Sequence, residues 1–491
     1  MIFNSIEFLI FFPIVVLLYF AIPKKIKPAW LLLASYYFYM SWSAKYAILI
    51  LISTVITYLS GLLMAKVEKK KWIVALSFIS NLGILFFFKY FNFIIDNINR
   101  GIHFAGIDKS IQAVELPMIV GISFYTFQAL SYTVDVYRGT IKPEKNFINY
   151  ALFVSFFPQL VAGPIERSGN LLSQIQMVSK QRLFNYQKIV SGFSLMCYGM
   201  FIKVVLADHL AALVDSIWDN LQMVGLVEGI VAMVAFSFQI YCDFSAYSAI
   251  AIGAARVMGF DLMENFNTPY LATSIKDFWR RWHISLSTWF RDYLYIPLGG
   301  NRKGKIRKYL NLMITFLVSG LWHGANWTYI IWGGMHGLMQ VIGDILHPVK
   351  MKICRLLKVN EEAESFKIGQ ICITFCLTSI AWVFFRAPSI REALRFFKYM
   401  IFNRDYWSLF DDHLFSFGLD RIDFEVTFVA LLVLIVFDLI RYFKSVDAGE
   451  FLARQNLWFR WVILIAFIVG TIIYGAYGID FDSAQFLYFQ F

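Results

Sequence analysis

The chain of 491 residues is 59% hydrophobic and 19% aromatic, and only 16% of its residues are charged, against about 25% in an average soluble domain. Lys and Arg outnumber Asp and Glu by 44 to 33, which gives a formal net charge of +11. The hydrophobic surplus extends from residue 6 to residue 474 and excludes a soluble multidomain enzyme, a disordered chain and a secreted disulfide scaffold. The composition predicts an all-α polytopic membrane protein with a single domain over residues 1–491.

Apolar segments follow one another along the chain. The first, residues 8–22, is followed rather than preceded by lysines, so we expect a retained span with its N-terminus outside rather than a signal peptide. The next two segments, 28–42 and 46–65, lead into a lysine cluster that the positive-inside rule places in the cytoplasm. Further apolar stretches lie near 73–91, 115–133, 148–162, 188–214, 226–258, 310–332, 333–346, 368–385, 424–440 and 459–476. Several are shorter than the roughly 20 residues that cross a bilayer, so we expect about 11 crossings, with re-entrant and interfacial helices around a cavity.

The longest polar interval, residues 260–309, predicts helices in or under the cytoplasmic face. From Lys276 to Lys308 it holds nine Lys or Arg against two Asp, interleaved with Trp279, Trp282 and Trp289. Tryptophan beside cations is typical of a helix at the headgroup interface. The interval therefore predicts an anchor to membrane lipids, and the same charge would attract a phosphate-bearing acyl donor. Because the basic residues follow the positive-inside rule, they indicate no nucleic-acid partner.

Two histidines follow in apolar stretches. His323 lies 15 residues after Lys308, or about 22 Å along a helix, and His336 lies in the next stretch. Ionisable side chains at such depth are costly and indicate function. The alternative is a packing histidine that bonds a neighbouring helix. Gly320 and Gly324 flank His323, so we expect room for another group beside its ring.

The residue types leave two kinds of histidine chemistry open. The sequence has no His-x-x-x-His pair and no carboxylate at ligand spacing, so we expect no metal and no tightly bound cofactor. It also lacks a Gly-x-Ser-x-Gly elbow, which argues against a serine hydrolase. A histidine relay in a lipid-linked sugar or proton-coupled transporter remains possible. So does acyl transfer, in which a neutral imidazole takes the proton of a hydroxyl that attacks a thioester.

Longer motifs favour acyl transfer over a transporter. They are Trp279-Arg-Arg-Trp-His283, Phe290-Arg-Asp-Tyr-Leu-Tyr-Ile-Pro-Leu-Gly-Gly-Asn301 and Ser319-Gly-Leu-Trp-His323-Gly-Ala-Asn326-Trp. Further motifs are Gly121-Ile-Ser-Phe-Tyr-Thr-Phe-Gln128, Ala162-Gly-Pro-Ile-Glu-Arg167 and Phe238-Gln-Ile-Tyr-Cys-Asp-Phe-Ser-Ala-Tyr247. Together they resemble the membrane-bound O-acyltransferase superfamily over nearly the whole chain, and most closely its bacterial branch of alginate and peptidoglycan O-acetyltransferases.

The resemblance implies a ring of helices around a central funnel in the bacterial inner membrane. It makes His323 and His283 the catalytic histidines, with His323 as general base. The supporting or substrate-tunnel residues that it implies are His336, Asn301, Arg291, Asp292, Trp322 and Asn326. The implied donor is acetyl-CoA or another small acyl thioester from the cytoplasm, and the implied acceptor is a cell-envelope or exported polysaccharide. An extracytoplasmic SGNH-hydrolase-like acetyltransferase is the implied partner. D-alanyl transfer to teichoic acid is the alternative acyl reaction.

The C-terminal aromatic motif, residues 486–491, reads Phe-Leu-Tyr-Phe-Gln-Phe. An aromatic anchor at the membrane interface explains it. It also resembles the end of a small partner protein in D-alanylation systems, and by that resemblance Tyr488 is a possible acyl carrier.

Overall fold

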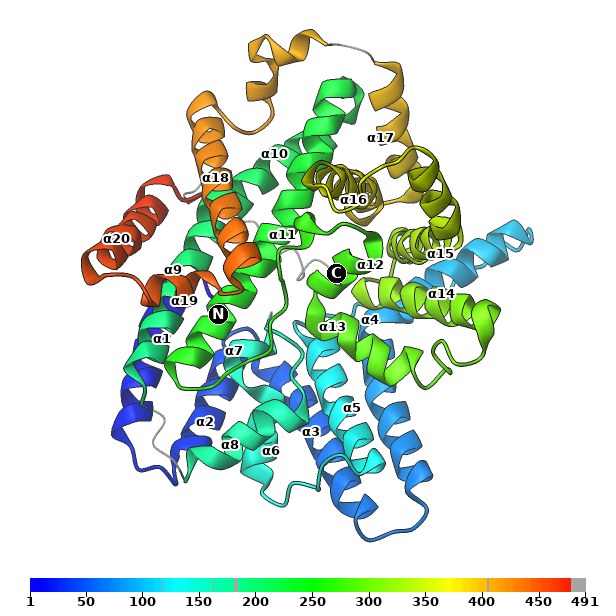
Figure 1. The fold of residues 1–491 in the computed structure, drawn as a ribbon. Helices are drawn as coiled ribbons and strands as arrows, with labels where there is room; N and C mark the ends of the chain where they lie inside the picture. The colour runs from blue at the N-terminus through cyan, green and yellow to red at the C-terminus, as the bar shows by residue number, and fades with distance from the viewer. Residues whose placement is uncertain (118, 162, 181–183, 404–405, 478–491) are drawn as a thin grey trace. The chain divides into compact units, whose positions relative to one another are not determined.

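The computed structural model describes residues 1–117, 119–161, 163–180, 184–403 and 406–477. Over these residues every regular element is a helix (Figure 1), which confirms the all-α prediction. The chain forms two compact units, Met1–Phe193 with Ala251–Met263, and Ser194–Ile250 with Glu264–Phe491. We call them unit 1 and unit 2. Tyr488 lies outside the described residues.

The helices have the following bounds. Unit 1 contains α1 (Ile6–Ala21), α2 (Lys27–Met40), α3 (Ala44–Met64), α4 (Lys70–Phe104), α5 (Ile122–Arg138), α6 (Phe147–Ser155), α7 (Phe157–Leu160), the π-helical turn η1 (Ser168–Leu172) and α8 (Ser173–Val178). Two helices, α9 (Tyr186–Phe201) and α11 (Leu226–Val257), run from one unit into the other. Unit 2 contains η2 (Ile202–Ala207), α10 (Asp208–Asp219), η3 (Leu221–Met223), η4 (Pro269–Leu271), α12 (Ile275–Arg281), α13 (Ile284–Phe290), η5 (Arg291–Tyr295), α14 (Gly304–His323), α15 (Trp327–Leu356), α16 (Glu364–Arg386), α17 (Ile390–Phe402), η6 (Trp407–Leu409), η7 (Asp412–Ser416), α18 (Arg421–Lys444), α19 (Ala448–Ala453) and α20 (Leu457–Tyr474).

Seven of the described helices are long and apolar enough to cross a membrane: Ala44–Met64, Lys70–Phe104, Tyr186–Asp219, Leu226–Val257, Glu364–Arg386, Arg421–Lys444 and Leu457–Tyr474. Ile6–Ala21 and Phe147–Leu160 are shorter apolar helices. The polytopic prediction is therefore confirmed, whereas the count of about 11 crossings is not. The helix that carries His323, α14, is not among the seven, and its first turns carry Lys305, Arg307 and Lys308.

The helices in the core of unit 1 are joined by hydrogen bonds between polar side chains as well as by packing. Helices α2, α3, α5 and α6 pack on one another (Figure 1). The Ser53 hydroxyl donates to Asn81 Oδ1 at 2.6 Å, and the Tyr150 hydroxyl donates to Thr57 Oγ1 at 2.7 Å. Where lipid surrounds a bundle, hydrophobicity does not drive helices together, so close packing and interhelical hydrogen bonds of this kind supply the attraction.

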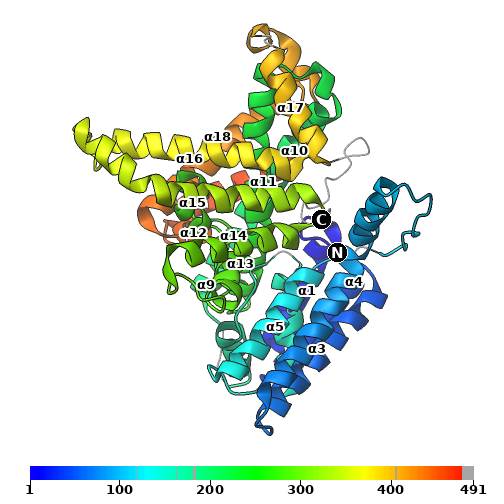
Figure 2. The same ribbon diagram turned by 90° about the vertical axis from the view of Figure 1, so that its right-hand side faces the viewer.

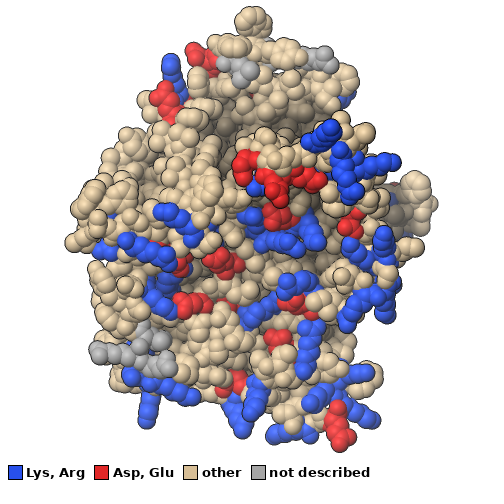
Figure 3. Space-filling view, viewed as in Figure 1, with Lys and Arg blue, Asp and Glu red and all other residues tan. Residues whose placement is uncertain are grey.

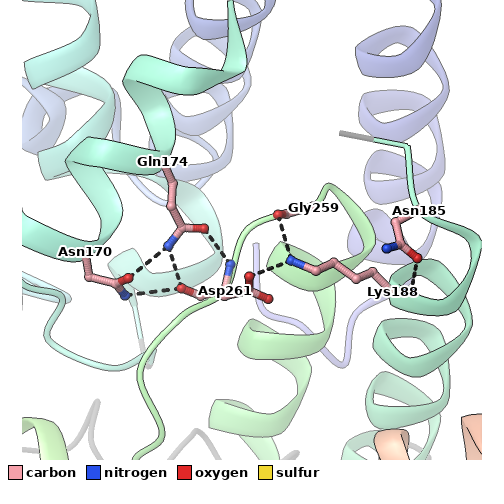
Figure 4. Close-up of polar contacts among 6 residues, drawn as sticks. All are labelled: Asn170, Gln174, Asn185, Lys188, Gly259 and Asp261. Atoms are coloured by element: carbon pink, nitrogen blue, oxygen red, sulfur yellow. Dashed lines mark hydrogen bonds and ion pairs between the residues drawn. The ribbon is translucent and has the colours of Figure 1, made fainter. Parts of the chain in front are cut away.

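A side-chain brace holds the loop after α11, which leads toward the segment of His283 (Figure 4). The Gln174 amide satisfies both backbone groups of Asp261, since it accepts from the amide nitrogen and donates to the carbonyl oxygen, each at 2.8 Å. Asn170 Nδ2 donates to the same carbonyl at 3.2 Å. Lys188 Nζ contacts the Asp261 carboxylate at 2.5 Å and the Gly259 carbonyl at 3.5 Å. The loop is thereby fixed without regular secondary structure.

The apolar stretch expected at 310–332 is not one continuous segment. Helix α14 ends at His323, and α15 begins at Trp327 and runs back beside it (Figure 2). The turn is fixed by Asn326, whose Oδ1 accepts from the Thr328 amide at 3.1 Å and so caps α15. Asn326 Nδ2 also donates to the Pro388 carbonyl at 3.0 Å, which ties the turn to the α16–α17 connection. His323 therefore lies at the turn of a helical hairpin.

The tryptophans of the basic interval are buried within the protein. Trp279, Trp282 and Trp289 are only 9%, 0% and 6% exposed. Helix α12 packs against α15 and α16, so its aromatic side faces the protein while Lys276 and Arg280 face outward. Figure 3 shows Lys and Arg side chains gathered where α14 begins. The interval therefore presents a cationic surface over a buried aromatic face, and its tryptophan rings pack on the protein instead of on lipid.

Candidate active site

Three histidines lie in one buried aromatic cluster of unit 2. His283, His323 and His336 are 0%, 3% and 0% exposed. The ring centroid of Trp322 is 5.0 Å from that of His323 and 6.0 Å from that of His283. The Trp332 centroid is 5.1 Å from both His323 and His336. His323 and His336 lie 40 and 53 residues after His283 in the sequence. The indole rings of Trp322 and Trp332 thus connect the three histidines in space.

The space expected beside His323 is filled by α15. A Cβ atom on Gly320 would lie 2.2 Å from the Tyr329 carbonyl oxygen, and one on Gly324 would lie 2.3 Å from the Tyr329 ring. The two glycines therefore permit close approach of α15 rather than access to the imidazole. The Phe385 ring, 5.4 Å from that of His323, adds a further wall from α16.

His283 is held in a backbone conformation that few side chains adopt. It is the N-cap of α13, with φ at 42°, and such left-handed residues cluster at functional sites. The buried Asn265 fixes it, since the Asn265 carbonyl accepts from the Ile284 amide at 2.8 Å and Asn265 Oδ1 accepts from the Ser285 hydroxyl at 2.6 Å. Burial, with the Phe244 ring 4.7 Å away, lowers the pKa of His283 to about 3. His283 is therefore neutral near pH 7.

His336 is bonded at one nitrogen. Trp279 Nε1 donates to His336 Nδ1 at 3.2 Å, so Nδ1 carries no proton. The Phe278 ring stacks on the imidazole, with the ring centroids 6.0 Å apart and an angle of 7° between the ring planes. The sequence left open that His336 is a packing histidine bonded to a neighbouring helix, and Nδ1 forms such a bond. The bond leaves the other ring nitrogen, Nε2, unexplained.

The remaining predicted residues divide between the cluster and the surface. Trp322 is in the cluster and Asn326 fixes the hairpin turn. Arg291 and Asn301 are exposed, and Arg291 Nε pairs with the half-buried Asp292 at 2.8 Å. These three residues lie on the cationic surface rather than among the histidines.

Asn265 is the residue that the sequence analysis missed. Its side chain joins residues 17 and 20 positions away, since Nδ2 donates to the Ser248 hydroxyl at 3.0 Å. Nothing in the sequence pattern distinguishes this asparagine from the other polar residues of the interval, so its function could not be predicted. Within the described part of the chain, no three His, Cys, Asp or Glu side chains are grouped to hold a metal ion.

Comparisons with known proteins show the family to which the chain belongs. Residues 4–352, which include all three histidines, match the membrane-bound O-acyltransferase family. The chain is 39% identical over 451 residues to a probable alginate O-acetylase of Pseudomonas aeruginosa, covering 91% of this chain and 83% of the relative. It is 37% identical over 401 residues to a peptidoglycan O-acetyltransferase of Helicobacter pylori, covering 76% and 73%. A teichoic acid D-alanyltransferase of Streptococcus thermophilus is 30% identical over 240 residues, covering 46% and 56%. The chain therefore belongs to the membrane-bound O-acyltransferase family and is a multi-pass membrane O-acyltransferase.

Proposed function

We propose that this enzyme moves an acetyl group from acetyl-CoA in the cytoplasm to hydroxyl groups of a cell-envelope or exported polysaccharide. The relatives named for alginate and peptidoglycan O-acetylation match 91% and 76% of the chain. The relative named for teichoic acid D-alanylation matches 46% at lower identity. This difference favours acetyl transfer over D-alanyl transfer, and the acyltransferase names favour both over a transporter.

His323 is the general base of the proposal. The observation that carries it is the position of this imidazole at the hairpin turn, 3% exposed and enclosed by the rings of Trp322, Trp332 and Phe385. An imidazole accepts a proton in its neutral form, through the ring nitrogen that carries no hydrogen. A positioned base of this kind contributes about 10²–10⁴ in rate.

The reaction needs one proton acceptor. The hydroxyl oxygen that receives the acyl group, which is that of Tyr488 if this residue is the carrier, attacks the thioester carbonyl carbon while its proton passes to His323. The bond from carbon to sulfur then breaks, and the leaving thiolate takes the proton back from the imidazolium. The products are an ester and a free thiol, and His323 returns to its neutral form.

The cationic surface serves the donor. Lys303, Lys305 and Arg307 at the start of α14 are exposed, and such a surface raises the local concentration of a phosphate-bearing ligand. The KM for acetyl-CoA should therefore rise with ionic strength, while kcat stays constant. Arg291 and Asn301 lie on the same segment and are proposed to support this step.

Completion of the transfer outside the membrane is assigned to an SGNH-hydrolase-like acetyltransferase, with Tyr488 as the acyl carrier between the two proteins. Peptide mapping after incubation with the donor should find an acyl group on Tyr488, and Tyr488→Phe should abolish it. Full transfer after removal of residues 486–491 would contradict the carrier.

The direct test is reconstitution in proteoliposomes with labelled acetyl-CoA. His323→Ala should lower acetyl transfer by at least about 10²-fold. The matched control is His347→Ala, because His347 is an exposed histidine on α15. Unimpaired transfer by His323→Ala would refute the base, and would favour a protein that only recruits an outer transferase.

A further inference from the structure

Helix α15 buries two N–H donors for which no acceptor exists among the described residues. They are Trp332 Nε1 and His336 Nε2, and both side chains are 0% exposed. Residues four apart lie on the same face of a helix. Buried donors are almost always paired, because an unpaired one loses its hydration without compensation. These two lie on one face of α15 and have hydrogen-bonding capacity left for a ligand that accepts hydrogen bonds.

The protonation of His336 is fixed by its neighbour. Because Nδ1 accepts from Trp279 Nε1 at 3.2 Å, the proton of the neutral imidazole resides on Nε2. His336 is therefore a donor at the nitrogen that has no partner. Trp279 acts as a positioning residue, since its indole selects this tautomer.

The Trp332 ring lies between the rings of His323 and His336 in the chain of ring contacts. The Trp332 ring is 5.1 Å from the His323 ring and 5.1 Å from the His336 ring. We propose that Trp332 and His336 donate the hydrogen bonds that stabilise the oxyanion formed on the carbonyl oxygen of the acyl donor. This inference rests on the proposed acyl transfer with His323 as base.

The chemistry of the step requires such donors. When the acceptor oxygen bonds to the carbonyl carbon, the electron pair of the C=O π bond moves onto the carbonyl oxygen. When the carbon–sulfur bond breaks, that pair re-forms the double bond and the sulfur leaves as thiolate. Negative charge on the oxygen is thus transient, and donors shielded from water stabilise it more strongly than solvated ones. Donors without a protein acceptor give up no existing hydrogen bond to do so.

A matched pair of variants tests the indole. Trp282 is also 0% exposed, and its Nε1 likewise has no acceptor in the described part of the chain. Its ring packs on Trp382 at 5.0 Å and on Phe266 at 5.1 Å. Trp332→Phe and Trp282→Phe each remove an unpaired indole N–H and keep an aromatic ring. We expect Trp332→Phe to lower kcat by about 10²-fold or more with little change in KM, and Trp282→Phe to leave kcat unchanged.

A second pair tests the imidazole. In His336→Gln the side-chain amide reaches the position of Nε2, whereas in His336→Asn it ends near Nδ1. We expect Gln to retain most of kcat and Asn to lose about 10²-fold. Trp279→Phe frees the tautomer, so kcat should fall by a smaller factor than in His336→Asn.

The outcomes separate this inference from the proposed function. Thermal unfolding of each variant shows how much folded enzyme is assayed. If His323→Ala is inactive while Trp332→Phe and His336→Asn keep their kcat, the oxyanion donors are wrong and the base stands. If Trp332→Phe and Trp282→Phe lose the same activity, the indole N–H has no special function and the inference is overturned. If His323→Ala is active, the proposed function itself fails.

Discussion

A methyl group added to Gly320 should disturb catalysis by pushing α14 and α15 apart. The added Cβ would lie 2.2 Å from the Tyr329 carbonyl oxygen, where ordinary contact begins at 3.4 Å. The obstacle is backbone, which cannot rotate away, so the helices must separate by about 1.2 Å, the difference between these two distances. Overpacking of this kind lowers the unfolding free energy by about 1–3 kcal/mol. The higher helix propensity of Ala over Gly offsets up to about 1 kcal/mol of this loss.

The same displacement moves His323 relative to Trp332 and His336. A misplacement of about 1 Å typically costs about 10²-fold in rate. We therefore expect Gly320→Ala to lower acetyl transfer about 10²-fold while reducing the unfolding free energy by no more than about 3 kcal/mol.

Thermal unfolding in detergent and transfer of labelled acetyl groups in proteoliposomes measure the two effects. Gly343→Ala is the control, because a Cβ at this position of α15 meets nothing within 4 Å. This control should be as active as the wild type and equally or slightly more stable. If Gly320→Ala matches Gly343→Ala in both assays, the close crossing does not position the site.

Three further predictions concern stability, measured as the unfolding midpoint in detergent. Asn326→Ala loses the cap of α15 and the bond to the α16–α17 connection, and each loss should cost about 1 kcal/mol. Asn326→Asp should keep the cap, so an equal loss of stability in both variants would refute the capping function. Gln174→Ala should destabilise more than Lys188→Ala, because Gln174 satisfies two backbone groups while Lys188 forms a partly exposed ion pair worth at most about 1 kcal/mol; the reverse order would contradict the brace. Burial raises the pKa of Glu166 to about 7, against 4.5 for an exposed carboxyl, so the folded protein binds this proton more tightly than the unfolded chain. Stability should therefore fall by on the order of 3 kcal/mol as pH rises from about 4.5 to about 7, and a Glu166→Gln variant with the same pH dependence as the wild type would refute the assignment.

The histidines that we propose for the site could be chosen from the sequence, but their surroundings could not. His283 and His323 stand in motifs with several characteristic residues, so their types and order were sufficient. The end of α14 at His323 was missed because the apolar run continues past it. Yet Gly324 followed by Asn326 is a recognisable stop and cap.

The burial of the tryptophans was beyond sequence reasoning for a different reason. Helix α12 has only seven residues, too few for a periodic pattern to show which face turns inward. Both faces of the segment looked suited to an interface. Which one is buried depends on α15 and α16, and neither is adjacent to α12 along the chain.

The end of α14 at His323 has an electrostatic consequence. The last carbonyl groups of a helix have no partners within it, and together they place roughly half a negative charge at its C-terminus. A cation at such an end gains about 0.3–1 kcal/mol, and up to about 2 kcal/mol where it is partly buried. The backbone therefore favours the imidazolium at the moment when His323 holds the hydroxyl proton, so the end of the helix supports the charge that the ring carries in mid-reaction.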